Sequence, residues 1–109
     1  MIEELDEEGR PCPPPPVLEG SEARELKIVN RKGLHARATA KFVQCVDRFD
    51  AEISVTRCGE TVGGDSIMGI LTLGAGLGST ITVAARGAQA KEALDALAAL
   101  VAGRFGEDE

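Results

Sequence analysis

The chain has 109 residues, of which 43% are hydrophobic, and this length and composition fit one small domain with a single core. It contains three Phe and neither Trp nor Tyr, so it has few aromatic side chains on which nucleotide bases could stack. Its net charge of −6 also disfavours binding to another polyanion. Composition and charge therefore argue against a nucleic-acid-binding protein.

The first 24 residues hold most of the negative charge, with seven acidic side chains, two arginines and the run PCPPPP at residues 11–16. This composition favours a solvated, extended chain. We expect residues 1–24 to form a disordered acidic and proline-rich extension. The acidic start and the lack of an apolar run of about 18 residues predict a cytoplasmic protein without membrane insertion.

After residue 24, apolar and polar residues recur with the spacing of strands and helices. Leu26 and Ile28 alternate with polar residues, which predicts a strand from residue 25 to about residue 30. After a turn, residues 36–47 contain no Gly or Pro and carry apolar side chains at three- and four-residue spacing, which predicts the first helix. Residues 53–56 and 60–62 follow as the two strands of a hairpin.

The second half of the chain predicts a short helix, a strand and a long helix. The short helix covers residues 67–73, which glycines bound on both sides. Alternation at residues 80–85 predicts another strand, and an Ala-rich apolar stripe predicts a helix from about residue 88 to residue 105. The order βαββαβα indicates an α+β fold, an open-faced sandwich in which three helices cover one face of a four-stranded antiparallel sheet. Residues 106–109 are expected to form an acidic C-terminal tail.

His35 is the only histidine and lies between a glycine turn and the start of the first predicted helix. The first backbone N–H groups of a helix are unpaired and lie at the positive end of its dipole, so they can bind an anion beside the imidazole. Arg37 adds a permanently charged group that can bind phosphoryl oxygens, and Gly33 permits the tight turn. These features fit a phosphorylated histidine, with a surface or capping histidine as the alternative.

Four basic residues surround His35 without an acidic residue between positions 30 and 46, a pattern that suits phosphate and acidic partner surfaces: Arg31, Lys32, Arg37 and Lys41. The chain has no P-loop, and its three cysteines are not spaced as in a zinc site. We therefore expect no cofactor, no metal and dependence on a separate phosphoryl donor.

Two motifs characterise residues 25–105: GLHAR at residues 33–37, followed by AKFV at residues 40–43, and DSIMGILTLG at residues 65–74. With these motifs, the segment resembles HPr, the histidine-containing phosphocarrier of the bacterial phosphoenolpyruvate-dependent phosphotransferase system. The resemblance implies a carrier protein, not an enzyme. It makes His35 the phosphorylated residue and Arg37 its phosphate partner, with Gly33 and Ala36 supporting the phosphate.

The resemblance also implies partners. Phosphorylated enzyme I would be the donor and a IIA-type protein the acceptor, in sugar transport or in regulation. Ile67, Met68 and Leu71 are expected to form the partner surface of a monomeric protein. Many sugar-transport HPr proteins have proline at the position of Ala38. An alanine there is similar to the residue found in the nitrogen-type and alphaproteobacterial branches of the family.

Ser66 has two interpretations. The resemblance makes it the serine that an HPr kinase phosphorylates in many bacteria, whereas its place before an apolar helix fits an N-cap. The negative charge of Asp65 disfavours phosphorylation beside it. A rival function for the whole chain is a regulatory HPr-like binding module that transfers no phosphoryl group. His35 and Arg37 favour the carrier, because family members that act purely in regulation tend to lack the histidine.

Overall fold

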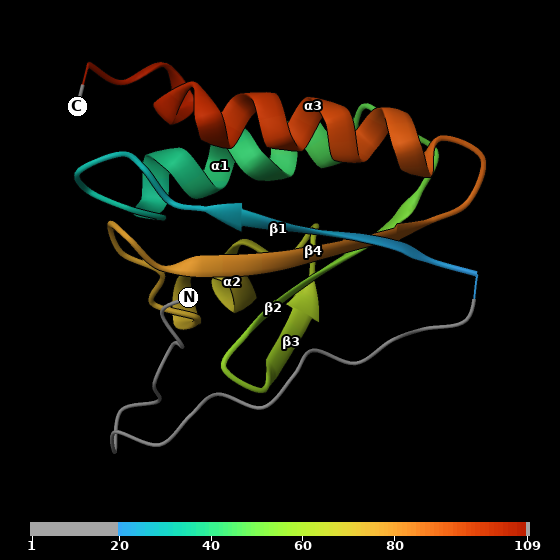
Figure 1. The fold of residues 1–109 in the computed structure, drawn as a ribbon, viewed down its shortest axis with the longest axis horizontal. Helices are drawn as coiled ribbons and strands as arrows, with labels where there is room; N and C mark the ends of the chain where they lie inside the picture. Colours follow the sequence, from blue (N-terminus) through green and yellow to red (C-terminus); the bar gives the residue numbers. More distant parts are fainter. Residues whose placement is uncertain (1–19, 109) are drawn as a thin grey trace.

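The computed structural model describes residues 20–108, which form a four-stranded sheet and three α-helices (Figure 1). In chain order the elements are β1 (Glu22–Lys27), α1 (Ala36–Val46), β2 (Glu52–Arg57), β3 (Glu60–Gly63), α2 (Ile67–Thr72), β4 (Thr80–Arg86), α3 (Ala90–Ala102) and the short 3₁₀ helix η1 (Arg104–Gly106). The predicted order βαββαβα is confirmed. Most of the predicted disordered extension, residues 1–19, lies outside the described residues, as does Glu109. Residues 22–24, which the prediction included in the extension, belong to β1 and pair with β4.

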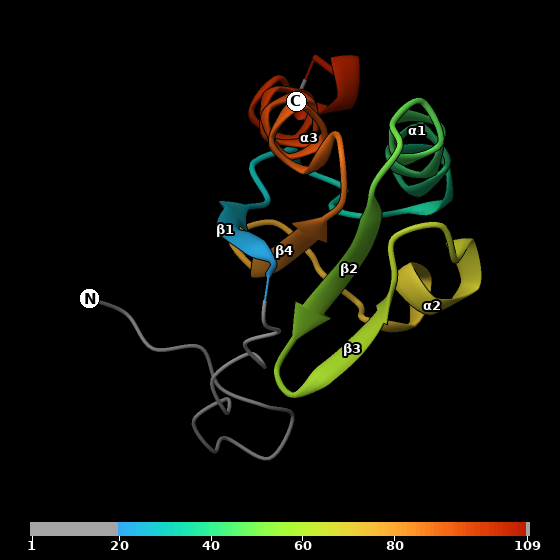
Figure 2. The ribbon, with the colours of Figure 1, turned by 90° about the vertical axis from the view of Figure 1, so that its right-hand side faces the viewer.

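The strands are all antiparallel and lie in the order β1-β4-β2-β3. Val83 of β4 pairs with Arg24 of β1 on one side and Val55 of β2 on the other. Figure 2 shows the three helices on one side of the sheet, with α1 and α3 above the central strands and α2 beside β2 and β3. The predicted open-faced sandwich is therefore confirmed.

The core lies between the sheet and the helices. Along β4 the side chains of Ile81, Val83 and Ala85 are buried, whereas those between them are partly exposed, as a strand with one covered face requires. Phe42 of α1 and Leu97 of α3 are fully buried and pack against this face. Burial of apolar surface on the covered face holds the helices to the sheet.

The first strand and the last helix differ most from their predicted bounds. The first strand begins at Glu22 and ends at Lys27. It ends there because the next residues pair with a loop: Ile28 N–H donates to the Ser79 carbonyl (2.8 Å). The last helix ends at Ala102, and the prediction that it continues to Phe105 is wrong. Arg104 and Phe105 adopt left-handed backbone angles (φ 59° and 54°), which turn the chain back toward the core.

Within residues 20–108, no helix combines the length and apolar character needed to cross a membrane.

Candidate functional site

The loop that carries His35 is packed tightly on the loop before β4. Leu34 N–H donates to the Ala75 carbonyl oxygen (2.9 Å), and Gly33 lies at a φ of +66°. A Cβ atom on Gly33 would lie 2.5 Å from the Ala75 carbonyl oxygen and 2.7 Å from the Gly76 Cα. Glycine is therefore required both for the backbone angle and for the close approach of the two loops.

A Gly33→Ala variant is expected to lower the free energy of unfolding by about 2 kcal/mol, since it adds left-handed strain and a backbone clash. Gly74→Ala is the matched control, because Gly74 has a similar φ of +63° but nothing within 4 Å of its added Cβ. The free energy of unfolding of Gly74→Ala should fall by only about 1 kcal/mol, the cost of the left-handed backbone angle. Urea denaturation measures both variants, and equal losses would show that the contact at Gly33 relaxes at no cost.

His35 is the N-cap residue of α1, but its side chain makes no capping hydrogen bond. The first backbone bond of the helix runs from Thr39 N–H to the His35 carbonyl (2.9 Å), and the Thr39 hydroxyl donates to the Leu34 carbonyl (3.2 Å). The N–H groups of Ala36 and Arg37 precede this first bonded group, and both residues are exposed. The amino end of the helix thus opens toward solvent beside an imidazole that is 28% exposed.

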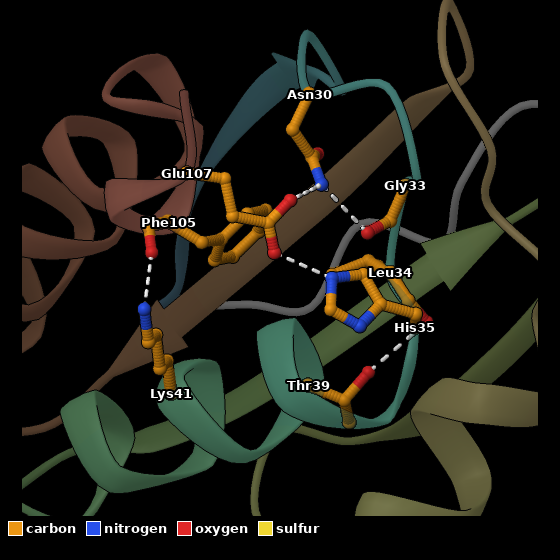
Figure 3. A network of polar contacts seen from close by, with 8 residues as sticks. All are labelled: Asn30, Gly33, Leu34, His35, Thr39, Lys41, Phe105 and Glu107. Atoms are coloured by element: carbon orange, nitrogen blue, oxygen red, sulfur yellow. Dashed lines mark hydrogen bonds and ion pairs between the residues drawn. The ribbon is translucent and has the colours of Figure 1, made fainter. Parts of the chain in front are cut away.

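A carboxylate from the far end of the chain contacts the imidazole. Glu107, 72 residues away in sequence, places its Oε2 atom 2.5 Å from His35 Nε2 (Figure 3). Its other oxygen, Oε1, accepts a hydrogen bond from Asn30 Nδ2 (3.0 Å), and the same Nδ2 donates to the Gly33 carbonyl (2.9 Å). These contacts link the loop after β1, the glycine turn and the C-terminal segment to His35.

The Glu107 contact determines which imidazole nitrogen carries the proton in neutral His35. An ionised carboxylate can only accept hydrogen bonds, so Nε2 must be the donor. The other nitrogen, Nδ1, then carries the lone pair, and Figure 3 shows it turned away from Glu107. The imidazole nitrogen that carries the free lone pair is therefore Nδ1.

Hydrogen bonds keep Glu107 ionised. Donation from Asn30, followed by that from His35, lowers the pKa of the Glu107 carboxyl below its ordinary value of 4.5, and the charge of Lys32 acts in the same direction. Because folding lowers this pKa, the contact stabilises the fold above about pH 4.5 and is lost as the pH falls further. The carboxylate thus keeps its charge at neutral pH.

His35 and Glu107 line one pocket of about 480 Å³, together with Arg31, Lys32, Ala36, Arg37 and Asp108. Three basic side chains border this pocket, and among residues 20–108 no ion-pair partner holds the Arg37 guanidinium. A guanidinium of this kind can bind two oxygens of a phosphoryl group. The pocket therefore combines an imidazole nitrogen that carries a lone pair with basic side chains that can bind an anion.

The predicted partner and regulatory residues lie on α2. Ser66 is its N-cap, and its hydroxyl oxygen accepts a hydrogen bond from Gly69 N–H (3.1 Å). Met68 is 71% exposed and Ile67 42%, whereas Leu71 is partly buried. Leu77, on the loop that contacts the His35 loop, is 62% exposed and was not predicted from the sequence.

The structure brings His35, Ala36 and Arg37 together in the pocket, whereas Gly33 and the α2 residues do not line it. Sequence patterns missed Glu107, Asn30 and Asp108. In the part of the chain that the structure describes, no group of three His, Cys, Asp or Glu side chains could hold a metal ion.

An antiparallel sheet covered by three helices, with one histidine at the start of a helix and beside basic side chains, defines the class of small phosphocarrier proteins. Residues 22–103 match the family described as "PTS HPr component phosphorylation site". The chain belongs to this HPr family and is a phosphocarrier protein of the phosphotransferase system, not an enzyme.

The individual relatives agree with this assignment. The chain is 48% identical to phosphocarrier protein HPr of Cupriavidus necator over 86 residues, which cover 79% of this chain and 97% of that protein. It is 42% identical to phosphocarrier protein NPr of Shewanella violacea over 84 residues, covering 77% and 92%. A solved structure, HPr-C-His from Thermoanaerobacter tengcongensis, superimposes with a TM-score of 0.78 at 38% identity and covers 81% of this chain and 99% of that one.

Proposed function

We propose that His35 accepts a phosphoryl group from phosphorylated enzyme I and passes it to a histidine of a IIA-type protein. The observation that supports this most directly is the pocket itself, where Nδ1 carries a lone pair and the Arg37 guanidinium has no ion-pair partner within residues 20–108. Both groups are needed to receive a phosphoryl group and to hold its oxygens.

In the accepting step, the Nδ1 lone pair forms a bond to phosphorus while the bond to the donor nitrogen breaks and its electron pair returns to the donor. His35 then carries a phosphoryl group on Nδ1 and a proton on Nε2, so its ring is positively charged. In the second step an acceptor nitrogen attacks phosphorus and the electron pair returns to Nδ1. The Nε2 proton stays in place throughout, so neither step needs a separate proton donor.

The neighbouring residues would stabilise the phosphoryl group by charge and position. Arg37 would bind its oxygens, and the N–H groups of Ala36 and Arg37 at the start of α1 would face it. Gly33 would act through the backbone by allowing the turn that places His35 at the helix start.

The proposal is tested by incubating the full chain with phosphoenolpyruvate and enzyme I, followed by mass spectrometry and peptide mapping. One added phosphoryl group is expected on His35, stable in alkali and lost in acid, as a phosphoramidate should be. Subsequent addition of a IIA-type protein should remove it. An unchanged mass, or an acid-stable phosphate at another residue, would contradict the proposal.

The partner surface is proposed to comprise Ile67, Met68 and Leu71. The exposure of Met68 and Ile67 supports this, since a flexible Met side chain adapts to more than one partner. The adjoining basic residues of the pocket would contact acidic groups on the same partners. We further propose that the chain acts as a monomer in the cytoplasm, where both partners could reach His35.

Ser66 is proposed as a site of regulatory phosphorylation by an HPr kinase. A phosphate there would add negative charge beside the exposed Ile67 and Met68 and weaken partner binding. Incubation with ATP and an HPr kinase, followed by mass spectrometry, tests this role. A mass gain confined to Ser66 is expected, and an unchanged mass would leave the serine with its capping role alone.

A Ser66→Ala variant is expected to lower the free energy of unfolding by about 1 kcal/mol, because it removes the hydrogen bond that the serine oxygen accepts from Gly69 N–H. A Ser66→Asn variant should restore much of this stability, since Asn is also a good N-cap residue. Urea denaturation measures both. Equal stability of Ser66→Ala and the unmodified chain would show that the cap contributes nothing.

A further inference from the structure

Asn30 is a buried polar residue whose contacts centre on the pocket. Its side chain has no exposed surface, and within residues 20–108 its Oδ1 atom has no hydrogen-bond partner. An unpaired buried oxygen is unfavourable for folding. The amide oxygen thus lowers stability, whereas the two hydrogen bonds that the amide nitrogen donates connect the glycine turn to Glu107.

The orientation of the Asn30 amide follows from its partners. Both the Gly33 carbonyl and the Glu107 carboxylate are acceptors, so the NH₂ group must face them and the oxygen must point away. Asn30 thus presents a fixed donor to Glu107 Oε1. With Oε1 occupied, Oε2 is left for the imidazole (Figure 3).

The C-terminal segment is held in place independently of His35. Phe105 is 1% exposed in the core, and its carbonyl accepts a hydrogen bond from Lys41 Nζ (2.5 Å). These contacts hold the segment that precedes Glu107, and neither of them involves the imidazole. The position of the Glu107 carboxylate is therefore set by the fold of the C-terminal segment and not by its contact with His35.

We propose that Asn30 and Glu107 are positioning residues of phosphoryl transfer: Asn30 orients the Glu107 carboxylate, which holds the proton on His35 Nε2 and so keeps Nδ1 as the nucleophile. The inference rests on the proposed function of His35. It adds that the same carboxylate pairs with the positive ring of phosphorylated His35, in which Nε2 still carries its proton. Glu107 and Asn30 touch neither the phosphoryl group nor a partner in this role.

The chain's single histidine allows a direct test by NMR. In ¹⁵N-labelled full chain at about pH 8.5, long-range ¹H–¹⁵N correlations of the only imidazole report which nitrogen carries the proton. We expect Nε2–H in the unmodified chain. A Glu107→Gln variant should shift the proton toward Nδ1, because the fixed Asn30 donor would take the Gln carbonyl oxygen and turn the Gln NH₂ group toward Nε2.

Asn30 is tested by combining the two substitutions. In the double variant Asn30→Ala with Glu107→Gln, the Gln side chain is free to rotate, and the proton should return toward Nε2. Asp108→Asn is the matched control, since it removes one carboxylate of the same pocket without altering a contact to the imidazole. It should leave the proton on Nε2. If the substitution Glu107→Gln left the proton on Nε2, the positioning role would be overturned.

Phosphoryl transfer gives the second measurement. Glu107→Gln should slow transfer from phosphorylated enzyme I by at least about tenfold, the cost of losing one charge-assisted hydrogen bond to the reacting ring. An unchanged rate would overturn the inference. If instead the unmodified chain showed the expected Nε2–H but accepted no phosphoryl group, the proposed function would fail while the positioning of His35 stood.

Discussion

A His35→Ala variant is expected to accept no measurable phosphoryl group from enzyme I and phosphoenolpyruvate. Loss of an attacking nucleophile lowers rates by a factor on the order of 10⁶. His35 is the only imidazole in the chain, so no other side chain can form a phosphoimidazole. Mass spectrometry of the intact protein, with and without acid treatment, measures the result.

The fold of this variant should remain intact, because the His35 side chain is partly exposed and makes no capping hydrogen bond. Its free energy of unfolding should fall by about 1.5 kcal/mol, because the substitution removes one hydrogen bond to the Glu107 carboxylate. Ser66→Ala is the matched control, since it removes the other proposed phosphorylation site and should still gain an acid-labile phosphate. An acid-labile phosphate on His35→Ala would contradict the assignment of the carrier residue.

Local patterns predicted most of the fold. The alternation of Ile81 and Val83 and the helical spacing after His35 depend on neighbours in sequence, and β4 and α1 agree with them. The lateral order of the strands depends on contacts between distant segments, on which a local pattern carries no information. Sequence order alone does not show that β4 lies between β1 and β2.

The site was predictable only in its local part. Gly33, His35 and Arg37 are neighbours in sequence, and their chemistry can be inferred together. Asn30 carried a usable signal, because the alternation of Leu26 and Ile28 continues to it and places a polar side chain on the buried face. No sequence pattern indicated Glu107, since this residue reaches the site only because the left-handed backbone angles at residues 104 and 105 end the helix and redirect the chain.

The residue that redirects this segment is Phe105, and a Phe105→Ala variant is expected to lose about 4 kcal/mol of unfolding free energy. The side chain is 1% exposed, so its removal leaves a cavity in the core. Without the burial of this ring, the left-handed turn at residues 104 and 105 is no longer stabilised. Urea denaturation should show a lower midpoint. The proton on His35 should also be distributed over both nitrogens, because Glu107 is no longer delivered to the imidazole.

Phe42→Ala separates these two effects. Phe42 is also fully buried but lies on α1, so its removal should lower stability by a similar amount, about 4 kcal/mol, and leave Glu107 beside His35. Phe105→Leu, which retains most of the buried volume, should lose less than about 1.5 kcal/mol and keep the proton on Nε2. If Phe105→Ala and Phe42→Ala gave the same imidazole signals at temperatures where both are folded, Phe105 would anchor the core without positioning Glu107. If only Phe105→Ala changed them, one buried ring would couple the packing of the core to the position of the proton on His35.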